Sequence, residues 1–111
     1  MPFRSPDESL RDIADSIGMI EAFVSGMAFE EFTQDPKTVA AVERKLLIIS
    51  EAAIRLGEDA DTCCPGPLWR DIRGMGNWLR HKYDRIDLAV IWKTVQDDLP
   101  RLKTTVLRAL E

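Results

Sequence analysis

The chain has 111 residues, of which 45% are hydrophobic and 31% charged, and its formal net charge is -4. This size and composition are typical of one globular domain with a single core, which we assign to residues 1–111. The N-terminus lacks the basic start and apolar run of a signal peptide, and no apolar run is long enough to span a membrane, so we expect a cytoplasmic protein. The adjacent residues Cys63 and Cys64 and a single histidine give no zinc-ligand spacing, so we expect neither a metal nor another cofactor.

The first half of the chain predicts two helices. The segment Ser5-Pro6-Asp7-Glu8 supplies a cap, a first-turn proline and a capping-box glutamate, and apolar residues then recur at helical spacing as far as Met27. We expect this helix to fray over residues 26–32. Asp35-Pro36 begins the second helix, which Gly57 ends.

The second half predicts a loop over residues 57–67 and two more helices. The third helix runs from about Leu68 to Tyr83, and Asp87 caps the fourth, in which Pro100 should cause a kink or mark a weak turn. Because no segment indicates a strand, the expected fold is all-α, an antiparallel four-helix bundle. Some apolar residues of the first two helices extend beyond one stripe, which favours either a homodimer or a slightly larger core: Met19, Phe23, Ile48 and Ile54.

The third helix carries the candidate site. Its predicted core face holds Leu68, Ile72, Met75 and Leu79, and the opposite face holds Arg70, Arg73, Asn77 and His81. Polar residues opposite a core face occur on any surface helix, but arginine, amide and imidazole groups without glutamate or lysine suit phosphate binding. Residues 69–85 hold five basic and two acidic residues, a local +3, which leaves 10 basic and 17 acidic residues, or −7, elsewhere. The tryptophans Trp69, Trp78 and Trp92 are expected in the core or an interface, with Trp78 the most exposed.

One imidazole per chain limits the chemistry. Cleavage of RNA without a metal needs one group to deprotonate the ribose 2′-hydroxyl, another to protonate the leaving 5′-oxygen, and cationic groups on the phosphate. A two-fold dimer that pairs the third helices would bring two copies of His81 into one cleft. If the chain is a nuclease of this type, the dimer should therefore be the working unit.

The residues around this helix resemble the HepT-like group of HEPN (higher eukaryotes and prokaryotes nucleotide-binding) proteins. The resemblance rests on Trp69-Arg70-Asp71-Ile72, Gly74-Met75, Asn77, Leu79, His81, Tyr83, Asp87-Leu88 and Asp97-Asp98-Leu99-Pro100. In the second helix, Arg44-Lys45-Leu46 and Ser50-Glu51-Ala52-Ala53 are similar to the family's Arg-Asn-Leu and Gly-Glu-Ala segments. The family implies an all-helical homodimer that acts as a metal-independent endoribonuclease toxin. Its implied partners are RNA and a minimal nucleotidyltransferase antitoxin, which silences the toxin by attaching AMP to the tyrosine, here Tyr83.

The chain departs from the family signature, which is an arginine, four residues, a histidine, one residue and a tyrosine. The arginine position holds Gly76, which has no side chain to bind phosphate. Arg73 and Arg80 lie about one turn to either side, so either could take the arginine's place beside Asn77 and His81. Alternatively, Gly76 marks an inactive toxin, natural or engineered.

Three functions follow. The leading hypothesis is a ribonuclease toxin in which His81 transfers protons, Asn77 orients or binds phosphate, Arg73 or Arg80 neutralises it, and Tyr83 is AMPylated. The second is a catalytically impaired dimer that still binds the nucleotidyltransferase. The third is a generic dimeric bundle with a polar outer face, in which Tyr83 stays unmodified.

Overall fold

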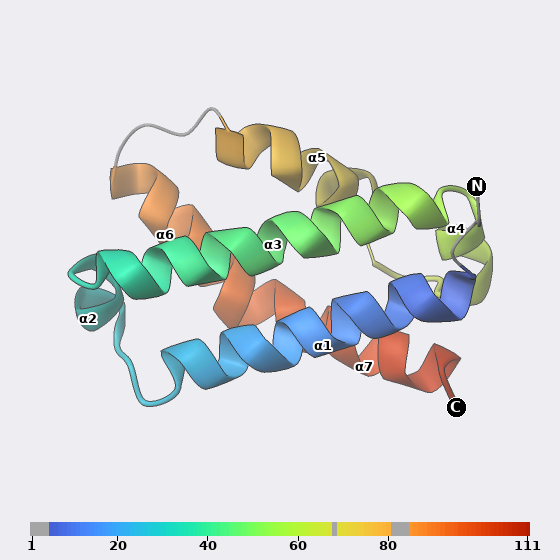
Figure 1. Ribbon diagram of the computed structural model, residues 1–111, viewed down its shortest axis with the longest axis horizontal. Coiled ribbons are helices and arrows are strands. Elements are labelled where there is room, and N and C mark those ends of the chain that lie inside the picture. Colours follow the sequence, from blue (N-terminus) through green and yellow to red (C-terminus); the bar gives the residue numbers. More distant parts are fainter. Residues whose placement is uncertain (1–4, 68, 81–84) are drawn as a thin grey trace.

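The computed structural model describes residues 5–67, 69–80 and 85–111, and the regular elements within these ranges are all helices, as the sequence predicts. Two long helices lie side by side, α1 (Pro6–Val24) and α3 (Pro36–Leu56), with the short α2 (Phe29–Thr33) between them in sequence (Figure 1). After α4 (Asp59–Cys63), α5 (Trp69–Arg80) packs on α3. The chain ends in α6 (Arg85–Lys93), the π-helical turn η1 (Thr94–Asp98) and α7 (Leu99–Ala109), which packs on α1.

Both predicted caps of the long helices are present. The Ser5 hydroxyl accepts a hydrogen bond from the Glu8 backbone N–H at 3.3 Å. The Asp35 carboxylate accepts from the backbone N–H of Thr38 at 3.0 Å and from its hydroxyl at 2.8 Å, and these two bonds hold the pKa of Asp35 below its ordinary value. The predicted starts of α1 and α3 are therefore confirmed.

Two predicted irregular segments are more ordered than expected. The first helix ends at Val24 rather than fraying over residues 26–32, because Gly26 turns the chain at a φ of 77° and α2 follows. The predicted loop over residues 57–67 contains α4, a helix too short to show hydrophobic periodicity.

The end of α4 is anchored to the start of α5. The Trp69 indole N–H donates to the Cys64 carbonyl at 2.9 Å. Cys64 is buried, and this burial, together with the Cys63 sulfur 3.6 Å away, raises the pKa of its thiol to about 12. Cys64 is thus a core residue, whereas Cys63 is exposed.

The irregularity expected at Pro100 appears just before it. The Leu99 N–H donates to the carbonyl of Thr94, five residues earlier, which gives the π-helical turn. Since Pro100 has no N–H, it cannot bond to a carbonyl of the preceding turn. The fourth predicted helix therefore continues to Ala109 with a widened turn in its middle.

The core lies between α1, α3 and α6–α7. Trp69 is a core residue as predicted, and the half-buried Trp92 packs against the core, with its ring centroid 6.2 Å from that of Phe29 and 5.1 Å from that of Phe32. Trp78 is half-buried. Outside the core, Met19 and Ile54 are 44% and 58% exposed. None of the helices in the described ranges has the length and apolar composition that crossing a membrane requires.

Candidate functional site

Helix α5 meets α3 through a face that the periodicity did not predict. Its fully buried residues are Trp69 and Gly76, whereas the predicted core residues Ile72, Met75 and Leu79 are half-buried. Leu68, also predicted for the core, lies outside the described residues. Ile72, Met75 and Leu79 do pack against the core as predicted, but the closest approach to α3 is on the adjacent face, where a glycine lets the two backbones come near each other.

A single buried hydroxyl holds this contact. Ser50 of α3 is 1% exposed, and its Oγ donates to the Arg73 carbonyl at 2.9 Å and accepts from the Gly76 N–H at 3.0 Å. Both bonds go to the backbone of α5, so Ser50 fixes the position of that helix along α3. Each such bond contributes on the order of 1 kcal/mol.

A side chain at Gly76 would crowd its neighbours on α3. A Cβ built there would lie 3.0 Å from Ser50 Oγ, 3.1 Å from Leu47 Cδ1 and 3.5 Å from Ser50 Cβ. Gly74, two residues earlier in the same helix, has no atom within 4 Å of its Cβ position. The signature position thus lies in a helix–helix contact.

The other candidate residues of α5 differ in exposure. Arg73 does not lie on the outer face as predicted, because its backbone is held against α3. It is half-buried, and its Nη1 is buried without a hydrogen-bond partner among the described residues. Asn77 and Arg80 are exposed, in agreement with the sequence for Asn77. His81 and Tyr83, on which the predicted chemistry depends, lie outside the described residues, so their roles stay predictions.

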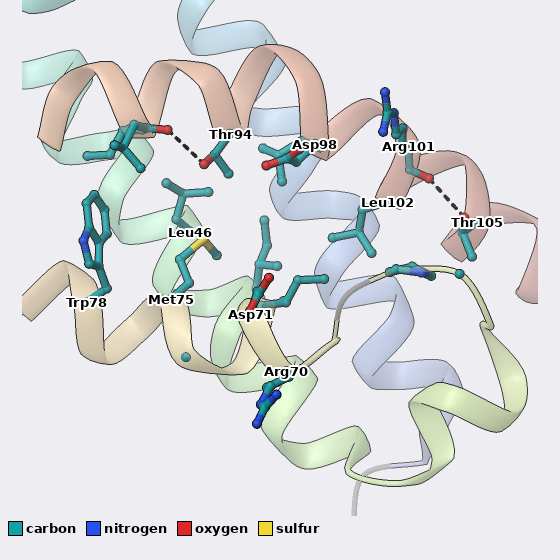
Figure 2. Close-up of a pocket in the computed structure, with 18 residues that line it drawn as sticks. Leu46, Arg70, Asp71, Met75, Trp78, Thr94, Asp98, Arg101, Leu102 and Thr105 are labelled. Carbon is teal, nitrogen blue, oxygen red and sulfur yellow. Dashed lines mark hydrogen bonds between the residues drawn. The ribbon is translucent and has the colours of Figure 1, made fainter. Parts of the chain in front are cut away.

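A cavity of about 850 Å³ lies on another side of α5, between that helix, α6, η1 and α7. Met75 and Trp78 of α5 face Thr94 and Leu102 across it, and Leu46 of α3 forms part of its floor (Figure 2). Charged residues of both sides line it as well, among them Arg70, Asp71, Asp98 and Arg101. The cavity is therefore apolar inside, with both signs of charge in its lining.

Sequence reasoning missed Ser50 as part of the site. One signal for it was present in the sequence, since Ser50 is a small polar residue inside the apolar stripe of Leu46, Ile49 and Ala53. A hydroxyl buried at such a position needs a hydrogen-bond partner. That partner is the backbone of another helix, which no pattern within α3 could identify.

Comparison with known proteins adds the family. The model of the HepT-like ribonucleases matches residues 13–109. The chain belongs to the HepT-like ribonuclease family. A protein of Thermococcus cleftensis named "Probable ribonuclease HepT" is 42% identical over 100 residues, which cover 90% of this chain and 91% of the relative.

Two further relatives span most of the chain. A protein of Methanocaldococcus jannaschii named "Putative RNase" is 34% identical over 97 residues. The match covers 87% of this chain and 89% of the relative. Another relative, from Caldanaerobacter subterraneus subsp. tengcongensis and named "Putative RNase", is 30% identical over 108 residues. The match covers 97% of this chain and 96% of the relative. No solved structure gives a significant match. The family resemblance stated from the sequence is thereby confirmed, and the names of the family and of these relatives support ribonuclease activity at the level of the family.

Proposed function

We propose that this HepT-like protein is a metal-independent endoribonuclease toxin that works as a homodimer and uses His81 for proton transfer. The observation that carries the proposal is family membership over residues 13–109 together with His81 and Tyr83 at the signature spacing. A histidine near its ordinary pKa can act as base and acid at neutral pH. Two copies in one cleft would supply both roles.

Arg80 is the residue we propose to neutralise the RNA phosphate. It is exposed and lies one turn after Gly76 and directly before His81, whereas the backbone of Arg73 is held by Ser50 against α3. An exposed guanidinium can reach a bound phosphate with two parallel hydrogen bonds. The exposed amide of Asn77, three residues before Arg80, is available to orient that phosphate.

Cleavage of RNA in the presence of a chelator tests this assignment. We expect His81→Ala to lower the rate by about 100-fold or more, the usual contribution of a general acid–base. Arg80→Ala should also lower it strongly. Arg70→Ala is the matched control, because Arg70 is an exposed arginine of the same helix that lines the cavity instead. Equal rates for the wild type and His81→Ala would reject the nuclease assignment.

The proposed partner is a minimal nucleotidyltransferase that attaches AMP to Tyr83. The added phosphate would repel RNA from a cleft that depends on positive charge, and the adenosine would occupy space in it. Co-expression with the nucleotidyltransferase from the neighbouring reading frame, followed by intact-mass measurement, should show added AMP on the wild type and none on Tyr83→Phe. An unmodified wild type would instead favour the generic bundle.

A second function is favoured by the burial of Gly76. Gly76 lies in the contact with Ser50, so no arginine side chain is present at the signature position. In this alternative the chain acts as a catalytically impaired dimer that binds the nucleotidyltransferase. This alternative predicts a stable complex with the partner and no RNA cleavage by the wild type. Sedimentation of the mixed proteins and the cleavage assay above distinguish the two.

A further inference from the structure

Ser50 and Gly76 lie where α3 and α5 cross, and each restricts which residue can occupy the other position. Ser50 brings its hydroxyl to the backbone of α5 because Gly76 has no side chain in the way. A side chain at Gly76, in turn, would crowd that hydroxyl, which lies 3.0 Å from the Cβ position.

We propose that Ser50 and Gly76 form a matched pair, and that this fold accepts an arginine at position 76 only when the hydroxyl of Ser50 is removed. Ser50 would thus be the residue that excludes the signature arginine. The consequence for catalysis rests on the proposed ribonuclease function, but the exclusion itself does not.

The two neighbours of position 76 differ in how easily they can yield. Leu47 Cδ1 is the far end of a half-buried, flexible side chain, so a rotamer change can move it away. Ser50 Oγ is held by two hydrogen bonds to the backbone of α5, and moving it would break both. Replacing Ser50 by glycine removes both of its atoms near position 76, the Oγ at 3.0 Å and the Cβ at 3.5 Å.

The Cβ of a residue at position 76 would point toward α3, so an arginine there reaches solvent only if its chain runs along the contact between the two helices. Position 76 lies three residues after Arg73 and four before Arg80, so its side chain would emerge between theirs on the helix surface. A long side chain can keep its methylene groups in the contact between α3 and α5 while its guanidinium reaches solvent. Such an arginine would add a cation one turn before the Arg80–His81 segment.

Four proteins test the pair: the wild type, Gly76→Arg, Ser50→Gly and the double variant Ser50→Gly/Gly76→Arg. Thermal unfolding tests the exclusion. We expect Gly76→Arg alone to lower Tm by about 10 °C, as for an overpacked core position in a domain of this size. The double variant should unfold at a higher temperature than the sum of the two single changes predicts. Additive changes, or a Gly76→Arg protein as stable as the wild type, would overturn the proposal.

Metal-free RNA cleavage by the same four proteins, normalised to folded protein, tests the consequence for catalysis. We expect the double variant to cleave at least about tenfold faster than Gly76→Arg, since a correctly held cation stabilises the transition state. If the stabilities are coupled but none of the four proteins cleaves RNA, the matched pair stands and the ribonuclease function fails. If the double variant does not fold, the same coupling is measured with alanine at both positions, and additivity there overturns the pair.

Discussion

Alanine at position 76 should destabilise the protein, although glycine to alanine within a helix is ordinarily favourable. Helix propensity alone would stabilise by up to about 1 kcal/mol. Against this, the new methyl group would lie 3.0 Å from Ser50 Oγ and 3.1 Å from Leu47 Cδ1. Overpacking of that kind costs about 1 to 3 kcal/mol. We therefore expect Gly76→Ala to lower the free energy of unfolding by about 1 kcal/mol, the difference between these two effects.

Gly74→Ala is the matched control. Gly74 lies in the same helix, two residues earlier, and nothing is within 4 Å of its Cβ position, so only the propensity gain of up to about 1 kcal/mol remains. The two variants should differ by about 2 kcal/mol, which corresponds to roughly 10 °C in Tm for a domain of this size. Urea unfolding of both proteins beside the wild type resolves such a difference.

The Ser50→Ala background identifies the atom responsible. Without Oγ, the nearest remaining atom of residue 50 is its Cβ at 3.5 Å, an ordinary contact distance, and the other close atom, Leu47 Cδ1 at 3.1 Å, is the end of a flexible side chain. Gly76→Ala should therefore become neutral or stabilising there. Our interpretation of the contact would be refuted if Gly76→Ala stabilised the wild type as much as Gly74→Ala does. A cost that is the same with and without the serine hydroxyl would refute it as well.

Three further outcomes follow from the fold. Trp69→Phe keeps most of the buried ring but loses the hydrogen bond to the Cys64 carbonyl, so urea unfolding should show a loss of about 1 kcal/mol. Burial raises the pKa of the Cys64 thiol to about 12, so an alkylating reagent at pH 8 should modify Cys63 first, and Cys64 only after unfolding, as peptide mass mapping would show. The hydrogen bonds from Thr38 lower the pKa of Asp35 below 3.8, so its contribution to stability is present above that pH and is lost as the pH falls through the lower folded value. Asp35→Asn should flatten this part of the Tm-versus-pH profile, and an unchanged profile would contradict the assignment.

The sequence by itself determined the features that depend on neighbouring residues. The caps at Ser5 and Asp35 bond to backbone groups three residues away, so their spacing was sufficient to predict where α1 and α3 begin. The helical spacing of apolar residues likewise predicted an all-α fold, and the residues around His81 and Tyr83 predicted the family. These signals are local or are matched position by position, and they do not require knowledge of which helices touch.

Only the tertiary structure decided which face of α5 is buried and what occupies the signature position. Hydrophobic periodicity favoured the face of Ile72, Met75 and Leu79, because a glycine adds no apolar surface and so leaves no signal in such a pattern. The close approach of α5 to α3 at Gly76 arises from a hydroxyl 26 residues earlier in the chain, on another helix. Similarly, Cys64 and Trp69 are both buried and are joined by a hydrogen bond between the end of α4 and the start of α5. Contacts of this kind join elements through backbone atoms and small side chains, and therefore become visible only when the helices are placed together.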